Sequence, residues 1–411
     1  MRSAEKVTYF VGREEIALDD LEDFRQRVRA WLTERYEPRD PSRDDDRVDI
    51  IARAPDGHRA MIAGAVALQQ ALHAAGFTGL TVAIEHGGRG LTRAHQAVVA
   101  EELARVDSPS LRSLGIGLGL VMPTIMAVGT EEQKRRFVPK LVSGEEVWCQ
   151  LFSEPDAGSD LVSLRTRAVR DGDSWVVSGQ KVWSSLAADA AYGILLARTD
   201  PDADKPHAGI TMFILPMDRD GVTVRPLVDI TGGHHFNEVF LEEVVLHDSD
   251  ILGETNRGWN VANGTLSGER TGYVGGSGGG RRRRQAERAL HVAGRAADPV
   301  ARRRVADIAG RERLLELLVA RIEAGAVAGG NPACGSLVKL AAGTLEQRAA
   351  ELVIELLGAR GLAWECNDRD GNAASHGLNA SRQATIAGGT HQIQRNVIGE
   401  RVLGLPREPR P

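Results

Sequence analysis

The strongest constraint on the fold is the spacing of apolar residues, which changes twice along the chain. Near the N-terminus apolar residues recur every three to four positions, at Leu21, Phe24, Val28, Trp31 and Leu32. This is the spacing of one buried helix face. The segment TEEQ at 130–133 adds a capping box, in which a threonine begins a helix and a glutamine follows three residues later. We therefore expect a helical first third, broken by glycine-rich turns.

From residue 146 the helical spacing gives way to short runs typical of β-strands. An Asp-Gly pair at 171–172 indicates a hairpin, and a Ser-Gly pair at 178–179 predicts a second turn. After residue 253 helical spacing returns, with an apolar stripe at Leu345, Leu352, Val353, Leu356 and Leu357. The sequence thus predicts an α+β fold with helices at 1–145, an antiparallel β domain at 146–252 and a helical bundle at 253–411.

Composition narrows the function. The chain of 411 residues has a formal net charge of −5, which gives no general attraction to nucleic acid or anionic lipid. No run of eighteen apolar residues and no signal-peptide-like start occurs, so we expect no membrane span and a cytoplasmic location. Cys149, Cys334 and Cys366 are far apart, with no CxxC pair. We expect buried thiols rather than disulfides or metal ligands.

Two polar features admit more than one interpretation. Four consecutive arginines at 281–284 follow the segment GGSGGG. They fit a solvated helix start, or a basic patch for a phosphorylated carrier such as coenzyme A or an acyl carrier protein. The adjacent His234 and His235 suggest a metal or catalytic role, but no third ligand has suitable spacing. We expect a structural or surface role for them, and no metal site.

Two segments carry the candidate chemistry. QLFSEPDAGSD, at 150–160, leaves an apolar run and makes a turn of small residues. Its backbone amides and hydroxyls can hold a pyrophosphate or the polar edge of a flavin. GQKVWSS, at 179–185, is a strand whose Trp183 can stack on a flat ring. Taken alone, Trp183 also fits a core aromatic of a β domain, and Ser153 and Ser159 also fit ordinary turn residues.

With these segments the chain resembles the acyl-CoA dehydrogenase family of flavoproteins. The resemblance extends from about residue 21 to 407, and the matching motifs occur in the family's order: GTEEQKRRFVPKLVSGE, QLFSEPDAGSD, GDSWVVSGQKVW, ILGETNRGWNV and GTHQIQR. It implies the family fold, with an N-terminal helical domain, a middle β domain and a C-terminal four-helix bundle. It also implies an FAD cofactor and an acyl-CoA substrate.

The resemblance assigns roles around the flavin. It implies that Phe152 and Ser153 line the flavin ring and that Ser159 contacts the FAD pyrophosphate. Trp183 would pack against the ring, and Ser185 would hydrogen-bond its edge.

Family members are usually dimers of dimers in which FAD reaches a neighbouring subunit, so the resemblance implies a homotetramer. Glu355 and Ala359 stand in the segment that holds the adenosine end across that interface, where the family has glutamine and glycine. Arg295 stands roughly where the family has an arginine that pairs with the pyrophosphate. The aromatic-glycine pair expected after it reads Asp298-Pro299.

The segment TIAGGTHQIQR at 385–395 is here called the bend. In many family members a catalytic carboxylate precedes its glycine-threonine pair, at the position of Gly388. The resemblance implies that the backbone amide of Gly388 binds the thioester carbonyl, while Thr390 and Gln392 touch FAD. The bend therefore offers backbone donors and no base.

A minority of the family carries the base on a helix just after the β domain, where this chain reads LSGER at 266–270. We predict Glu269 as the general base, and Arg270 as a residue that positions it or contacts substrate. The alternative is a surface glutamate paired with a nearby arginine. A carboxylate desolvated in a dry pocket is a stronger base, which the weakly acidic Cα proton requires.

These expectations favour an FAD-dependent acyl-CoA dehydrogenase that forms a 2,3-enoyl thioester and passes electrons to an electron-transfer flavoprotein. Two alternatives stay open. One is a flavin monooxygenase of the same fold, which needs no base. The other is a non-catalytic subunit that completes a partner's FAD site in a mixed tetramer. The sequence does not fix the acyl group or the choice between coenzyme A and an acyl carrier protein.

Overall fold

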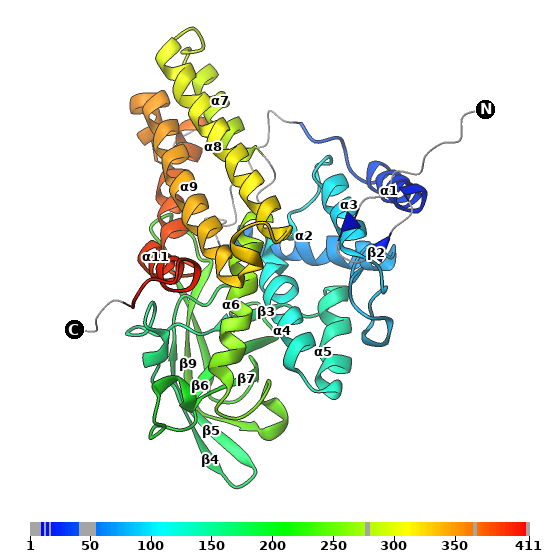
Figure 1. Cartoon of the computed structure of the whole chain (residues 1–411), viewed down its shortest axis with the longest axis vertical. Helices are drawn as coiled ribbons and strands as arrows, with labels where there is room; N and C mark the ends of the chain where they lie inside the picture. Colours follow the sequence, from blue (N-terminus) through cyan, green and yellow to red (C-terminus); the bar gives the residue numbers. More distant parts are fainter. Residues whose placement is uncertain are drawn as a thin grey trace.

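A computed structural model describes residues 10–11, 14–15, 18–40, 55–275, 280–364 and 368–407. In chain order, the large sheet separates an N-terminal from a C-terminal group of helices, and it lies at the bottom of the view in Figure 1. A short pair of strands, β1 (Phe10–Val11) and β2 (Glu14–Glu15), comes before the first helix. The N-terminal helices are α1 (Leu18–Thr33), α2 (Pro55–Ala74), α3 (Arg93–Leu103), α4 (Met122–Val128) and α5 (Glu131–Ser143).

The predicted N-terminal helical signals are confirmed. Phe24, Val28 and Leu32 are buried on one face of α1, with at most 3% of each exposed. The capping box of α5 is formed by Thr130 and Gln133. Gln133 is itself buried, and its Nε2 donates to the carbonyl oxygens of Ser249 and Ile251 at 2.9 and 2.8 Å. This side chain therefore ties α5 to the end of the β domain.

The middle of the chain forms a seven-stranded sheet. Its strands are β3 (Trp148–Leu151), β4 (Arg167–Asp171), β5 (Ser174–Lys181), β6 (Tyr192–Arg198), β7 (Ile210–Pro216), β8 (Val222–Leu227) and β9 (Phe236–His247). The order is β3-β6-β4-β5-β9-β8, with β7 also paired to β6. The pairs β4–β5, β5–β9, β6–β7 and β8–β9 are antiparallel, as expected. β6 also pairs in parallel with β3 and β4, which the spacing of apolar residues did not reveal.

Of the two turns predicted in this region, one is right and one is wrong. Gly172, with φ of +56°, turns the chain between β4 and β5. The predicted turn at 178–179 does not occur, because β5 continues through both residues with an irregularity in its register. A Cβ on Gly179 would lie 2.7 Å from the Cα of Thr166. The glycine therefore allows close approach of the two backbones rather than a change of direction.

The C-terminal part is helical. Its helices are α6 (Gly258–Gly275), α7 (Arg281–Val292), α8 (Pro299–Glu323), α9 (Gly335–Leu357), α10 (Arg369–Ala380) and α11 (His391–Val397). The predicted apolar stripe lies on α9, where Leu345, Leu352 and Leu356 are buried in a cluster shared with α7 and α8. α6 packs against both α9 and β7. It therefore links the bundle to the sheet.

The expectation of buried thiols is confirmed for Cys149 and Cys334, which are free and buried. Burial raises the pKa of Cys149 to about 12. Cys366 lies outside the described residues.

Within the described part of the chain, every helix falls short of the length or apolar character needed to cross a membrane.

Candidate active site

The turn after β3 is fixed by a buried ion pair. Glu154 and Lys181 lie 2.8 Å apart, with 7% and 0% of their side chains exposed. Lys181 also donates to the carbonyl oxygen of Phe152 at 3.1 Å. Glu154 accepts the backbone N–H groups of Arg165 and Thr166 at 2.6 and 2.9 Å. The pair therefore holds the turn where the residues predicted to line the flavin begin.

Both members of this pair are charged at neutral pH. Burial lowers the pKa of Lys181 to about 8, against the opposing effect of Glu154. Burial alone would raise the pKa of Glu154, but Lys181 and the hydrogen bonds outweigh it, so that pKa is lowered. Beyond the pair, Phe152 is buried, Ser153 half-buried and Ser159 exposed.

Trp183 follows β5 with its ring directed outward. The residue is 58% exposed, so the alternative interpretation as a core aromatic is wrong. Its ring meets Phe236 edge-on, with centroids 5.5 Å apart. The φ of Trp183 is +59°, a left-handed conformation that costs a bulky residue about 1–3 kcal/mol. The Ser153 carbonyl accepts the N–H of Val182 at 2.9 Å, so this loop lies beside the turn after β3.

The loop that carries Trp183 and Ser185 is paired to the start of β9. Ser184 and Asn237 exchange two backbone hydrogen bonds of 3.0 and 3.1 Å, and the Asn237 side chain adds a third of 2.9 Å. Leu186, also left-handed with φ of +64°, donates its N–H to the His235 carbonyl at 3.3 Å. We call the surface made by Phe152, Ser153, Trp183, Ser185 and Phe236 the platform.

The bend is a second, separately built region. Gly388 and Gly389 have φ of +67° and +93°, in the left-handed range that favours glycine. Thr390 caps α11, its hydroxyl accepting the N–H of Ile393 at 3.3 Å. Gln392 is exposed. An L-residue at the φ of Gly388 would be strained, so glycine suits the backbone conformation that this chain adopts here.

Glu269 and Arg270 lie in α6, one helical turn after Thr265. The Thr265 hydroxyl is 2.8 Å from that of Thr124, so this turn of α6 contacts α4. The side chains of Glu269 and Arg270 are outside what the structure describes. Their roles stay predictions.

Two of the residues expected to contact the pyrophosphate and adenosine of FAD form ion pairs within this chain instead. Arg295 donates to Asp298 at 2.6 Å, a bond that lowers the pKa of Asp298. Glu355 pairs with Arg304 across the surfaces of α9 and α8. Ala359 is exposed in a 3-10 turn, Gly358–Leu362. Apart from the exposed Ser159, the remaining candidates with described side chains form two groups, at the platform and at the bend.

The arginine run is not an open basic patch. Arg281 and Arg282 both pair with Glu346, at 2.6 and 2.7 Å, and Arg282 is buried against Glu312. Arg283 pairs with Glu287 at 3.4 Å. The run does begin a helix, as one interpretation expected, but Arg281 and Arg282 are not solvated and instead tie α7 to α8 and α9.

The two adjacent histidines, His234 and His235, follow β8 and precede β9. No group of residues suited to a metal occurs among the described residues. His235 instead packs against His58 of α2, with ring centroids 5.5 Å apart. Burial, helped by His58, lowers the pKa of His235 to about 4. The structural role expected for His235 is confirmed, and it joins the N-terminal helices to the back of the platform.

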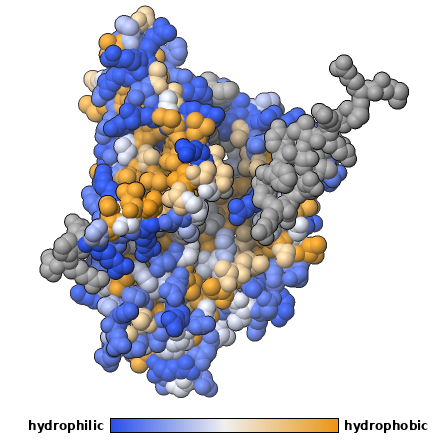
Figure 2. Space-filling model, in the orientation of Figure 1, coloured by the Kyte–Doolittle hydropathy of each residue, from blue (hydrophilic) through white to orange (hydrophobic). Residues whose placement is uncertain are grey.

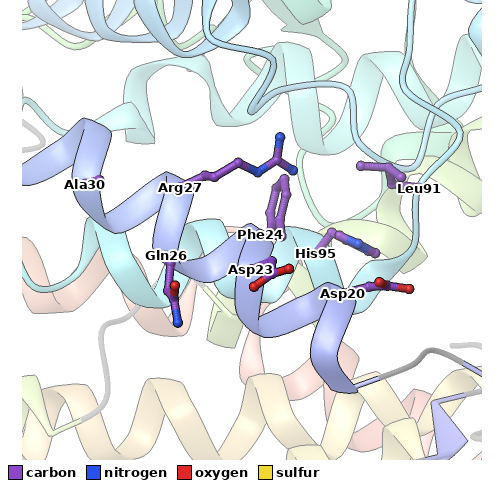
Figure 3. Close-up of a pocket in the computed structure, with 8 residues that line it drawn as sticks. All are labelled: Asp20, Asp23, Phe24, Gln26, Arg27, Ala30, Leu91 and His95. Carbon is purple, nitrogen blue, oxygen red and sulfur yellow. The ribbon is translucent and has the colours of Figure 1, made fainter.

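A cavity of about 750 Å³ that is open to solvent lies elsewhere, between α1 and α3 (Figure 3). It is lined by Asp20, Asp23, Phe24, Gln26, Arg27, Ala30, Leu91 and His95. Arg27 lies over the Phe24 ring, 5.4 Å from its centroid. None of the predicted site residues lines this cavity. Its carboxylates give it no resemblance to a dry thioester pocket.

The platform suits a flat, polar-edged cofactor such as a flavin. It offers one large exposed aromatic face at Trp183, with hydroxyls at Ser153 and Ser185. The buried hydroxyl of Ser184 has no hydrogen-bond partner among the described residues. An exposed aromatic ring held in a strained backbone conformation is typical of a ligand surface rather than of a core.

Sequence reasoning missed four supporting residues. Lys181 and Asn237 fix the platform, as described above. Lys339 on α9 is fully buried, and its Nζ donates to the Ala384 carbonyl at 2.5 Å, just before the bend. Gln394 is also fully buried and donates to the carbonyl oxygens of Gly388 and Gly389. Lys181 and Gln394 stood inside quoted motifs, but no local signal indicated that either is buried.

Comparisons with known proteins point to one family. Three family models match the chain in order. Their descriptions are acyl-CoA dehydrogenase N-terminal domain at residues 19–145, middle domain at 149–244 and C-terminal domain at 256–403. The chain is 37% identical over 402 residues to "Acyl-CoA dehydrogenase IpdE1" of Mycobacterium tuberculosis (strain ATCC 25618 / H37Rv), an alignment that covers 95% of this chain and 99% of that protein.

Two solved structures are also similar. "Tcur3481-Tcur3483 steroid ACAD" has a TM-score of 0.76 and 26% identity, covering 96% of this chain and 99% of that one. The ChsE4-ChsE5 complex from Mycobacterium tuberculosis has a TM-score of 0.73 and 27% identity, also covering 96% and 99%.

Proposed function

The chain belongs to the acyl-CoA dehydrogenase family of oxidoreductases, and on that premise we propose that it converts an acyl-CoA to its 2,3-enoyl thioester with FAD as cofactor. The observation that carries this proposal is the platform. Trp183 is exposed and strained, backed by Phe236 and adjacent to Ser153. A flavin ring stacked there would cover the exposed indole. The strained backbone of Trp183 would then serve to present its ring to the cofactor.

The proposed roles follow from the two regions. The platform would bind and orient the flavin ring through Trp183, Ser153 and Ser185. At the bend, the N–H of Gly388 would donate to the thioester carbonyl, which becomes more negative as the Cα proton leaves. Glu269 would remove that proton, and Arg270 would position Glu269 or contact the substrate. When bound, FAD supplies the acceptor for the hydride that leaves Cβ.

The remaining cofactor contacts are also proposals. Ser159 would touch the FAD pyrophosphate, and Thr390 with Gln392 would touch FAD from the bend. An electron-transfer flavoprotein is the proposed acceptor. The name of the similar steroid enzyme supports testing a steroid-like acyl group first. The cytoplasmic location stays a prediction from the sequence.

Anaerobic bleaching of the flavin by a panel of acyl-CoA thioesters tests this function. The wild type is compared with Glu269→Gln and with Glu132→Gln, an exposed glutamate of α5, as control. We expect Glu269→Gln to keep FAD and to lose roughly 10²- to 10⁴-fold in reduction rate, the usual contribution of a general base. The control should match the wild type.

The other outcomes are equally clear. Bleaching by Glu269→Gln at the wild-type rate would remove Glu269 from the mechanism. A flavin-loaded wild type that no thioester reduces would contradict the dehydrogenase itself. Acyl carrier protein thioesters would then be tried, and rapid reoxidation of chemically reduced flavin by oxygen would favour the monooxygenase alternative.

A second candidate is a non-catalytic subunit of a mixed assembly. Arg295 and Glu355, which the resemblance places near the far end of FAD, are engaged with Asp298 and Arg304 in this chain. The similar ChsE4-ChsE5 structure is a complex of two named components. Flavin absorbance in protein purified alone would contradict this candidate, and its absence together with recovery of flavin in the presence of a second chain would favour it.

We propose that the chain assembles with itself, as a homotetramer. Figure 2 shows an apolar surface over α8 and α9. On α8, Leu314 and Leu317 are 66% and 44% exposed. An apolar patch of this kind marks a contact surface. Light scattering of the wild type and of the double variant Leu314→Glu/Leu317→Glu checks this. Two carboxylates on the apolar surface should weaken the contact between subunits, so the measured particle mass should fall to that of a smaller assembly.

A further inference from the structure

The buried carboxamide of Gln394 is a polar group to which the proposed reaction gives no role. The residue is 0% exposed. Its Nε2 donates to the Gly388 carbonyl at 2.9 Å and to the Gly389 carbonyl at 3.2 Å. Its Oε1 is buried without a hydrogen-bond partner in the described part of the chain. A half-satisfied carboxamide is costly to bury, so its placement on these two carbonyls needs a reason.

The two hydrogen bonds fix the direction of the neighbouring amides. In a trans peptide the C=O and the following N–H point to opposite sides. Because the carbonyls of Gly388 and Gly389 both face Gln394, the N–H groups of Gly389 and Thr390 point away from it. The positive φ of both glycines makes this arrangement possible.

Helix α9 contacts the chain before and after these two glycines, at Ala384 and His391. Lys339 is buried and donates to the Ala384 carbonyl at 2.5 Å. One turn later, any Cβ on Gly343 would collide with the Ala384 carbonyl and lie 2.6 Å from Nε2 of His391. The backbone before the bend and the first residue of α11 therefore both rest directly on α9. Little freedom is left to the peptides between them.

We propose that Gln394 is a positioning residue for the reaction, acting with Lys339 to hold the peptides of the bend so that their N–H groups face the thioester carbonyl. The inference rests on the proposed function and adds two points to it. The donor set includes the amides of Gly389 and Thr390, whose peptides Gln394 holds, beside that of Gly388. Its orientation depends on a buried side chain that touches neither substrate nor cofactor.

The experiment compares Gln394→Met with Gln133→Met. Gln133 is the matched control, because it too is buried and donates from Nε2 to two backbone carbonyls, but in α5. Both variants lose two hydrogen bonds from Nε2 to backbone carbonyls, and Gln133→Met also loses the one that Oε1 accepts from the N–H of Thr130, so the control should lose at least as much thermal stability. The thioester that reduces the wild-type flavin fastest is used for rates. Its enoyl product, labelled with ¹³C at the carbonyl, is used for infrared difference spectra.

For Gln394→Met we expect the limiting rate of flavin reduction to fall roughly 10- to 100-fold, less than for deletion of an oxyanion donor. The affinity of the apoprotein for FAD should change by less than about threefold, since the lost interaction acts mainly in the transition state. The carbonyl band of the bound product should move toward its position in water. Gln133→Met should change none of these three.

Several results would overturn the proposal. Equal rate losses in the two variants would make Gln394 merely structural, as would an unshifted carbonyl band. If Gln394→Met does not fold, Gln394→Asn, which withdraws the carboxamide by one methylene, must show a smaller shift of the same sign. A wild type that no thioester reduces would contradict the proposed function instead, so the two failures are distinguishable.

Discussion

The platform and the bend present different chemical groups to a ligand, and each is held in place by a different kind of buried residue. The platform presents side chains on a backbone that is strained at Trp183 and Leu186, and a buried ion pair holds it from behind. The bend presents backbone on two glycines, and a neutral carboxamide holds it. A surface for a flat ring needs exposed side chains, whereas a donor pair for a carbonyl needs bare N–H groups. The supports differ accordingly, and each can be broken separately.

The largest effect is expected from breaking the ion pair of the platform. Lys181→Met leaves Glu154 charged and buried with only two backbone donors. Removal of one partner from a buried pair costs about 3–5 kcal/mol. Lys134→Met, which breaks a surface pair with Glu131, should cost about 0–1 kcal/mol. Urea denaturation measures both, and similar losses in the two variants would show that the buried pair does not hold the platform.

A pH profile tests the histidine behind the platform. The pKa of His235 is lowered to about 4 in the folded protein, from an ordinary value of about 6.5. Between these values the unfolded chain binds a proton that the folded chain does not. Stability therefore falls as the pH drops through this range, by at most about 3 kcal/mol.

The charged groups around His235 also affect the pKa values of the two packed histidines, His58 and His235. Burial lowers the pKa of His58, while Asp189 opposes that shift, and Asp229 opposes the shift of His235. His234 also adds to the lowering at His58. We expect His235→Leu to flatten the decline in unfolding free energy below about pH 6.5, and the exposed His207→Asn to leave it unchanged. An equally steep decline in His235→Leu would assign the proton uptake to another group.

Prediction from the sequence succeeded where the signal is local. The apolar stripe of α1, the capping box of α5 and the Asp-Gly hairpin lie within a few residues of the structure they specify. Gly179 shows where local signals fail. Its lack of a side chain allows the backbone of Thr166 to approach closely, and the sequence alone cannot distinguish such a glycine from one in a turn. The supports of the site are more distant still. Lys339 is 45 residues from Ala384, and Asn237 is 53 residues from Ser184.

A smaller effect is expected at the bend. Gly389→Ala places a methyl group at φ of +93°, only 2.6 Å from Nε2 of Gln394. The backbone strain alone costs about 1–2 kcal/mol, and displacement of Gln394 adds to it. Gly172→Ala in the hairpin has a similar φ problem but open space around its Cβ. Both should lose stability, and only Gly389→Ala should also slow flavin reduction. Equal rates in the two variants would mean that the bend tolerates a shift of Gln394.

The smallest effect separates two roles of one hydroxyl in the bend. Thr390 caps α11 and is also predicted to touch FAD. Thr390→Ala should lose about 1 kcal/mol of stability, whereas glycine at this cap costs only a few tenths. Thr390→Ser should behave as wild type. If FAD binds more weakly to both the alanine and the glycine variants, the hydroxyl contacts the cofactor. If only the alanine variant binds FAD more weakly, the hydroxyl acts by capping α11 and does not contact FAD. Glycine also removes the hydroxyl, but it largely preserves the N-terminal end of the helix.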